Sequence, residues 1–152
     1  MSATVPGFDR SQVSALDIWD ANARKWPSIG PPWRPSPGDV AIYRRFVGSR
    51  LPGRTLLLGA TPELRDLLAA HAGTMPKPVV IDMSRTMLEA MSALTHRARP
   101  QDETWLVADW CEAGLPERAF DLILADMIWW TLSVPMQVAL RERIGRLLAP
   151  DG

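Results

Sequence analysis

Residues 55–63 read Thr-Leu-Leu-Leu-Gly-Ala-Thr-Pro-Glu, and this stretch decides the fold. The run from Thr55 to Leu58 is short and largely apolar, which is typical of a strand buried on both faces of a sheet. Gly59 ends the run. Thr61 and Pro62 then provide a helix start, with threonine as the N-terminal cap and proline at the first helical position. The stretch predicts a buried strand, a tight turn and a helix.

The same alternation continues toward the C-terminus. Residues 78–82, 103–109 and 120–126 contain further short apolar runs, and each of these segments ends in an aspartate. Helical patterns separate or follow them: one begins at the cap Ser84, and another spans about residues 135–148. Strands that alternate with crossover segments in this order indicate an α/β fold with a parallel sheet and right-handed crossovers.

The first third of the chain predicts helices rather than strands. Trp19, Ala23 and Trp26 have the i, i+4, i+7 spacing of one helical face, so a helix is expected over residues 17–26. The segment that follows is rich in proline and glycine and is predicted to be irregular, because proline lacks the backbone N–H that a helix or a sheet needs.

A second helix is expected just before the sheet. Ser36 is a suitable N-terminal cap, Asp39 occupies the capping-box position, and Gly48 is predicted to end the helix. We expect residues 1–53 to form an N-terminal helical cap and residues 54–152 to form the sheet domain.

The composition narrows the class of protein. The chain has 152 residues, of which 47% are hydrophobic, and its 17 basic and 17 acidic side chains give a formal charge of zero. Such a chain can bury a core and is not typical of intrinsic disorder. Balanced charge gives no support for nucleic acid or an anionic membrane as a partner. We expect a cytoplasmic protein, because no secretory signal pattern and no long apolar run is present.

The predicted strand ends carry the candidate ligand site. In a parallel sheet the carboxyl ends of the strands lie at one edge, where ligands bind. Gly59 permits close approach of a ligand, and Asp82 follows at about the 20-residue spacing from which a carboxylate reaches a ribose diol. Asp109 can accept from an exocyclic amine while Trp110 stacks on a base. The set predicts a site for an adenosine-containing molecule.

These segments together resemble class I S-adenosylmethionine-dependent methyltransferases. The resemblance covers residues 54–152, in the order Leu-Gly-Ala-Thr-Pro-Glu, Val-Val-Ile-Asp-Met-Ser, Val-Ala-Asp-Trp, Phe-Asp-Leu-Ile-Leu-Ala-Asp and Leu-Leu-Ala-Pro-Asp-Gly. The Leu-Gly-x-Thr-Pro-Glu form of the first motif, and the tryptophan-rich N-terminal segment, look like those of one bacterial subgroup. The resemblance implies a doubly wound, Rossmann-like sheet with strand order 3-2-1-4 and S-adenosylmethionine as cofactor.

The resemblance also implies roles for individual residues. The turn after the first strand surrounds the methionine part of the cofactor, the acid after the second strand binds the ribose, and the residue after that acid packs on adenine. The acid after the third strand bonds the adenine amine. Carried over to this chain, the cofactor-binding residues are Gly59, Ala60, Thr61, Asp82, Met83, Asp109, Trp110 and Asp126.

Two departures from the family pattern matter. Leu57 stands where an acid is usual, and Thr61 and Glu63 replace later glycines of the first motif, which leaves the turn less room for the cofactor. The fourth strand is expected to keep an open edge, an aggregation liability. We therefore interpret the chain as truncated or as completed by a partner, for example in a homo-oligomer that covers this edge.

Three hypotheses remain at this point. The first is methyl transfer to a small-molecule acceptor, with Asp126 as the candidate catalytic residue. The second is a methyltransferase-like binding or structural module without activity. The third, a nicotinamide-dependent oxidoreductase, has little support because only the first of the three required glycines is present, at Gly59. His71, His96 and Cys111 have no neighbours in the sequence that indicate a metal site, so none is predicted.

Overall fold

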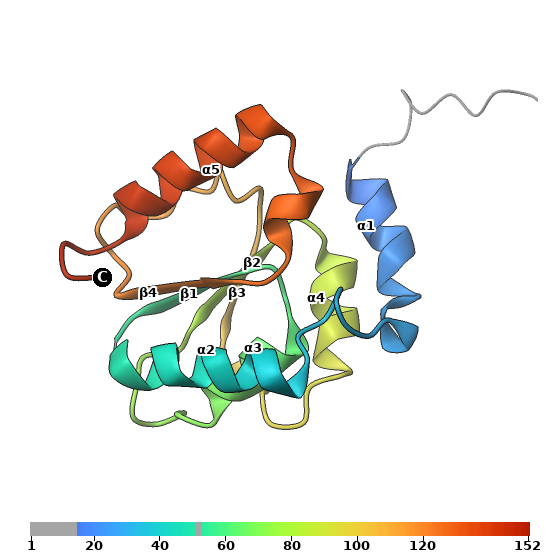
Figure 1. The fold of residues 1–152 in the computed structure, drawn as a ribbon, viewed down its shortest axis with the longest axis horizontal. Coiled ribbons are helices and arrows are strands. Elements are labelled where there is room, and N and C mark those ends of the chain that lie inside the picture. The colour runs from blue at the N-terminus through green and yellow to red at the C-terminus, as the bar shows by residue number, and fades with distance from the viewer. Residues whose placement is uncertain (1–14, 51–52) are drawn as a thin grey trace, which may run out of the picture.

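A computed structural model describes residues 15–50 and 53–152 of the chain, and Figure 1 shows their arrangement. A parallel sheet lies between two layers of helices. Its strands are β1 (Thr55–Leu58), β2 (Val79–Asp82), β3 (Thr104–Val107) and β4 (Leu122–Ala125). The α-helices are α1 (Ala15–Ala23), α2 (Pro37–Arg50), α3 (Pro62–Ala69), α4 (Arg85–Ser92) and α5 (Val134–Leu147).

The sheet has the strand order β3-β2-β1-β4, and every neighbouring pair is parallel. The predicted α/β fold and the predicted order 3-2-1-4 are therefore confirmed. All four residues of β1 are buried, because β1 lies between β2 and β4 and is covered on both faces. β3 lies at an edge, and Thr104 and Val107 at its two ends are exposed.

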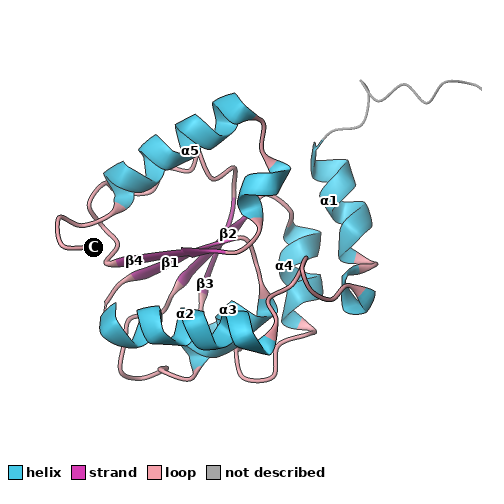
Figure 2. Cartoon of the chain, viewed as in Figure 1, coloured by secondary structure: helices cyan, strands magenta, loops and turns pink. Residues whose placement is uncertain are grey.

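The two faces of the sheet pack against different helices. Leu57 and Val80 contribute to one buried cluster with residues of α3 and α4, whereas Leu56, Leu58 and Ile81 contribute to a second cluster with residues of α5. This division follows from the two-residue period of a strand, which sends alternate side chains to opposite faces. Figure 2 shows α5 on one side of the sheet and α2 and α3 on the other.

Residues 15–34 form what we call the N-terminal segment. Its helix, α1, makes its main contacts with α4. The predicted helix over 17–26 is one turn shorter at its end, because α1 stops at Ala23 and a 3₁₀ turn, η2 (Trp26–Ser28), follows. Pro27 has no N–H to continue the α-helical hydrogen bonds. Trp19 and Trp26 still share a face: their rings meet edge to face, with centroids 6.4 Å apart.

The cap of α2 forms as the sequence predicts. The backbone N–H of Asp39 donates to Ser36 Oγ over 3.2 Å, and the backbone N–H of Ser36 donates to Asp39 Oδ2 over 2.9 Å. The prediction that Gly48 ends the helix is wrong, because α2 continues to Arg50. A glycine costs a helix only about 1 kcal/mol, and burial of Val47 in the preceding position favours continuation.

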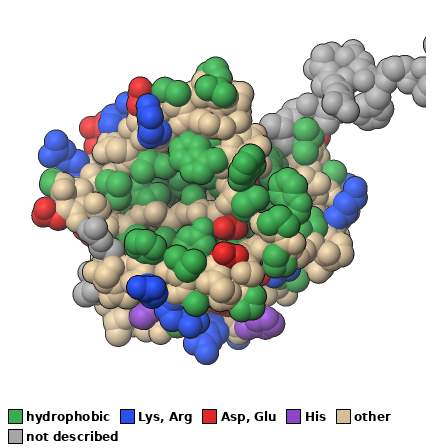
Figure 3. Space-filling view, in the orientation of Figure 1, with side chains coloured by type: hydrophobic (Ala, Val, Ile, Leu, Met, Phe, Trp, Pro, Cys, Tyr) green, Lys and Arg blue, Asp and Glu red, His purple; other side chains and the backbone are tan. Residues whose placement is uncertain are grey.

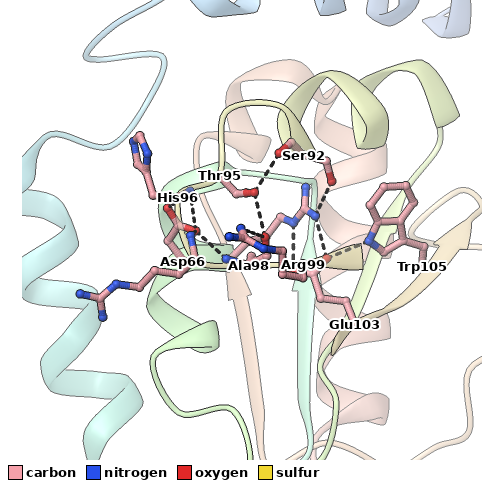
Figure 4. Close-up of polar contacts among 10 residues, drawn as sticks. Asp66, Ser92, Thr95, His96, Ala98, Arg99, Glu103 and Trp105 are labelled. Atoms are coloured by element: carbon pink, nitrogen blue, oxygen red, sulfur yellow. Dashed lines mark hydrogen bonds and ion pairs between the residues drawn. The ribbon is translucent and has the colours of Figure 1, made fainter. Parts of the chain in front are cut away.

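A buried ion pair connects elements at the far end of the sheet from the ligand edge (Figure 4). Arg65 of α3 is fully buried, and its Nε and Nη2 donate to the two carboxylate oxygens of Glu103 over 3.0 and 2.7 Å. Nη2 also donates to Ser92 of α4, and the indole of Trp105 in β3 donates to Glu103. The pair therefore fixes α3 and α4 relative to β3.

The next residue of α3 anchors a loop. The carboxylate of Asp66 accepts backbone N–H groups from His96, Arg97 and Ala98, at distances between 2.7 and 3.1 Å (Figure 4). These hydrogen bonds lower the pKa of Asp66, although burial raises it. The loop between α4 and β3 is thus held by one carboxylate.

The other edge of the sheet is β4, whose only strand partner in the described residues is β1. Large apolar side chains are exposed on α2 and in the turn after β4: Phe46 is 63% exposed, and Trp130 is 80% exposed. Figure 3 shows hydrophobic side chains gathered across the face between α5 and α2. Within the described ranges, no helix combines the length and the apolar character that crossing a membrane requires.

Candidate functional site

A pocket lies at the carboxyl ends of β1, β2 and β4 and is closed on one side by the N-terminal segment. The pocket is a narrow cleft that is open to solvent. All the predicted cofactor residues except Asp109 line it. The lining residues are Trp19, Trp26, Trp33, Gly59, Ala60, Thr61, Asp82, Met83, Met87, Met91, Trp110, Asp126, Met127, Ile128 and Thr131.

Gly59 forms the floor of the pocket where β1 ends. Its φ of +82° is a conformation that side chains with a Cβ adopt only at a cost, which explains the glycine. Its N–H donates to Ile81 O over 2.8 Å, so the turn stays joined to β2. A Cβ here would make ordinary van der Waals contact with Ile128 and Trp110, each at 4.0 Å, so the positive φ and not a lack of space favours glycine.

Asp82 is the most buried acid of the site, with 7% of its surface exposed. Its Oδ1 accepts the backbone N–H of Ser84 over 2.9 Å, and the carboxylate also accepts from the backbone of Ala60. Burial raises the pKa of Asp82 to about 6, and the nearby negative charge of Asp20 adds to the rise, while these backbone hydrogen bonds oppose it. The carboxylate therefore joins the turn after β1 to the turn after β2.

Ser84 connects the site to the N-terminal segment. Its Oγ accepts the backbone N–H of Met87 over 2.9 Å, which confirms it as the N-terminal cap of α4. The same hydroxyl donates to Oδ1 of Asp20 in α1. Sequence analysis missed Asp20, because no local signal relates an exposed-looking helical acid to a serine 64 positions away.

Thr61 occupies the N-cap position just before α3. The prediction that its side chain caps the helix is wrong, because its hydroxyl makes no capping hydrogen bond. Its backbone has φ −48° and ψ 115°, whereas the capping residue Ser84 has the more extended φ of −108°. The helix still begins here, because Pro62 has its φ fixed near the helical value. Thr61 lines the pocket, and its hydroxyl is not used to cap α3.

The two predicted residues after β3 behave differently. The Asp109 carboxylate accepts the backbone N–H of Cys111 over 2.8 Å and does not belong to the pocket wall. Trp110 does line the pocket, and its indole N–H donates to Ile81 O over 3.2 Å. That bond fixes the Trp110 ring beside Gly59, so the aromatic residue and not the acid of this pair is presented to a ligand.

Asp126 follows β4 and has a partner from α2. The Tyr43 hydroxyl lies 2.9 Å from Asp126 Oδ1 and 3.0 Å from Ala125 O. Burial raises the pKa of Asp126, the Tyr43 hydrogen bond lowers it, and the negative charges of Asp39 and Glu63 raise it. Burial and the Asp126 charge also raise the pKa of Tyr43, which therefore keeps its proton. Sequence analysis did not identify Tyr43 as a site residue.

The chain turns sharply after Asp126. Met127 has a φ of +57°, a conformation that costs a residue other than glycine roughly 1–2 kcal/mol. It leads into the 3₁₀ turn η4 (Ile128–Thr131), whose first residue is buried and lines the pocket. Strained residues of this kind are common at ligand sites.

The N-terminal segment supplies an aromatic side of the pocket. Trp19, Trp26 and Trp33 line it, and the Trp26 indole nitrogen is buried without a hydrogen-bond partner. Arg34 follows this group, and its Nε donates to Glu63 Oε1 over 2.9 Å. The Arg34–Glu63 pair holds the segment against the first turn of α3.

Comparison of the sequence with models of protein families identifies the family of this chain. The family model described as a methyltransferase domain matches residues 63–152, which is more than half of the chain. The chain therefore belongs to the methyltransferase domain family. A comparison with curated proteins gave no significant match.

Solved methyltransferase structures share the fold. A Haloferax volcanii protein bound to the Trm112 methyltransferase activator has a TM-score of 0.62 and 20% identity over 93% of this chain and 59% of its own. The N-methyltransferase NodS of Bradyrhizobium japonicum, in complex with S-adenosyl-L-homocysteine, has a TM-score of 0.61 and 18% identity. The match covers 86% of this chain and 67% of NodS. Phosphoethanolamine N-methyltransferase 2 of Haemonchus contortus has a TM-score of 0.62 and 24% identity. The match covers 93% of this chain and 32% of that protein. The chain thus spans between one third and two thirds of these proteins.

Proposed function

We propose that the pocket binds S-adenosylmethionine and that the protein transfers its methyl group to a small-molecule acceptor. Membership of the methyltransferase domain family supports the reaction class, and two of the similar structures contain S-adenosylhomocysteine. One observation carries the proposal for the site: the buried carboxylate of Asp82 and the positive-φ glycine Gly59 line the same pocket. That pair suits a ribose diol and the chain attached to it.

The pocket residues fit the cofactor. In our proposal the turn from Gly59 to Thr61 contacts the methionine part. The Asp82 carboxylate, which already accepts from the backbone of Ser84, Ala60 and Met83, accepts from the ribose diol with its remaining acceptor capacity. Met83 and Trp110 contact the adenine. Trp110 is suited to this because its ring is already fixed by Ile81 O.

Asp109 and Asp126 complete the predicted set. A bond from Asp109 to the adenine amine requires its carboxylate to turn from Cys111 N toward the pocket. Asp126 already lines the pocket on the β4 side, where an acceptor can approach the reacting methyl group.

The chemistry that these residues perform is mainly positioning. S-adenosylmethionine, when bound, supplies a methyl group activated by a positive sulfur. The protein then has to hold the acceptor in line with that group and exclude water, and such alignment accounts for much of a rate enhancement. The tryptophans of the N-terminal segment are placed to cover the pocket against solvent.

Leu57, which stands where the family pattern usually has an acid, does not line the pocket. Leu57 is fully buried in the cluster shared with α3 and α4, so it contributes to the core and not to the pocket wall. The leucine at this position therefore places no obstacle in the pocket.

Calorimetric titration of the chain with S-adenosylmethionine and with S-adenosylhomocysteine tests the proposal. We expect both to bind, and we expect Asp82→Asn to weaken both at least about tenfold, since it removes a charged acceptor. Absence of binding by the unaltered protein overturns the proposed function.

A second function, a methyltransferase-like module completed by a partner, has one specific observation in its favour. β4 is an edge strand in the described residues, and the large apolar side chains of Phe46 in α2 and Trp130 in η4 are exposed. Light scattering with size-exclusion chromatography distinguishes the two functions. A monomer with full cofactor affinity excludes the module, whereas a stable oligomer without cofactor affinity supports it.

A further inference from the structure

The charge of the pocket is negative. Asp82 and Asp126 are in its wall, and none of the described residues that line it is lysine, arginine or histidine. Glu63 and Asp39 lie near enough to Asp126 to raise its pKa by their charge. Arg34, which follows Trp33 in the chain, is paired with Glu63. An uncompensated negative potential of this kind attracts cations and repels anions.

The wall is also aromatic on the side opposite the strands. Trp19, Trp26 and Trp33, which we call the tryptophan wall, come from the N-terminal segment, whereas Asp126 comes from the end of β4. Trp33 is 56% exposed, which is unusual for so large an apolar side chain without a role. Tryptophan faces bind ammonium groups and the apolar carbon next to them.

Asp126 is the acid in the wall with capacity left for a ligand. Asp82 is already used by the backbone of Ser84 and Ala60 and is the candidate for the ribose. The Asp126 carboxylate has one side-chain partner, the Tyr43 hydroxyl on Oδ1, among the hydrogen bonds of the described residues. A carboxylate has about four acceptor positions, so it can bind a charged donor as well.

We propose that the methyl acceptor is a small amine that binds as its ammonium cation, with its nitrogen at the Asp126 carboxylate and its apolar part against the tryptophan wall. Before transfer the bound ammonium gives one proton to water through the Asp126 carboxylate. The freed lone pair then forms the new N–C bond while the S–C bond of the cofactor breaks and S-adenosylhomocysteine leaves. This substrate class rests on the proposed function. Tyr43 is a positioning residue in the same site: its hydroxyl holds Asp126 Oδ1, so the other oxygen is directed to the ligand.

The experiment uses three probes of nearly equal size and shape but different charge: benzylamine, benzyl alcohol and benzoate. Each is titrated by calorimetry into the full chain saturated with S-adenosylhomocysteine, which occupies the cofactor site and lacks the methyl group and the positive sulfur of the cofactor. We expect benzylamine to bind at least about tenfold more tightly than benzyl alcohol, and benzoate to bind most weakly.

Two pairs of variants locate the preference. Asp126→Asn removes the advantage of benzylamine over benzyl alcohol, whereas Glu117→Gln, at a carboxylate that is 63% exposed and outside the pocket, keeps it. Trp33→Ala weakens benzylamine binding several-fold, and Trp130→Ala, at an exposed tryptophan outside the pocket wall, does not.

The proposal is overturned if benzyl alcohol or benzoate binds as tightly as benzylamine, if none of the three binds, or if the preference survives Asp126→Asn. These outcomes differ from failure of the proposed function, which shows as absence of S-adenosylhomocysteine binding in the first titration. In that case the charge series on the chain alone still decides whether the cation site exists.

Discussion

The Tyr43 hydroxyl lies 2.9 Å from Oδ1 of Asp126, although 83 positions separate the two residues. The contact joins α2, beneath the sheet, to the carboxyl end of β4. It matters because Asp126 is the acid through which we propose that the acceptor binds, and because the hydrogen bond favours the ionised form of that acid.

Tyr43→Phe should move the pH dependence of ligand binding. Burial and the charges of Asp39 and Glu63 raise the pKa of Asp126, and the Tyr43 hydrogen bond lowers it. Benzylamine binding should be lost as the pH falls through this raised pKa, because the protonated acid no longer attracts the cation. Removing the hydroxyl should raise the midpoint further. Titrations between pH 4 and pH 8 measure the midpoint, and a midpoint equal to that of the unaltered protein contradicts the role given to Tyr43.

Asp82→Asn and Asp109→Asn should differ in their effect on cofactor binding. Asp82 lines the pocket, whereas the Asp109 carboxylate is bonded to Cys111 N outside the pocket wall. We expect the first variant to weaken S-adenosylhomocysteine binding at least about tenfold and the second to weaken it less than about threefold. The two variants are matched, because each converts one strand-end acid to its amide. Equal losses would show that Asp109 also reaches the cofactor.

The stability of the protein should rise as the pH falls from 6 toward 4, through Asp82. Its pKa is about 6 in the folded protein and about 3.8 in a solvated chain, so the folded state binds a proton in this interval that the unfolded state does not. The full contribution is on the order of 3 kcal/mol. Urea unfolding of the cofactor-free protein at several pH values measures it. Asp82→Asn should flatten this part of the profile, and an unchanged profile would assign the effect to another group.

Arg65→Met should destabilise the fold strongly, because it leaves Glu103 buried without its charge partner. Loss of one member of a buried ion pair costs about 3–5 kcal/mol. The matched control is Arg85→Met, at a pair with Glu89 in which both side chains are more than half exposed, for which a change below about 0.5 kcal/mol is expected. Urea unfolding compares them. Similar losses in the two variants would mean that Glu103 is compensated by other groups.

Gly59→Ala and Gly48→Ala should have opposite effects on stability. Gly59 has a φ of +82°, so alanine there costs about 1–2 kcal/mol and also narrows the approach to the cofactor. Gly48 lies within α2 with open space around the position of a Cβ, so alanine there should stabilise by about 0.5–1 kcal/mol. Thermal unfolding measures whether each variant is less or more stable than the unaltered protein. Calorimetry should show loss of S-adenosylhomocysteine affinity in Gly59→Ala alone.

Local patterns predicted much of the fold. The apolar run at 55–58, the turn at Gly59 and the cap at Ser84 each depend on a few neighbouring residues, and all three are present in the structure. The predicted ends of the helices were less accurate, as at Gly48, because a neighbour such as Val47 gains more from burial than glycine costs.

The sequence by itself determined the order of strands and helices, and hence that Gly59, Asp82 and Asp126 meet at one edge of a parallel sheet. Only the tertiary structure decided what each side chain does there. It turned the Asp109 carboxylate to its own loop and brought Tyr43 to Asp126. The reason is physical: helical and strand periods are set by residues a few positions apart, whereas hydrogen bonds across the molecule depend on how whole helices pack.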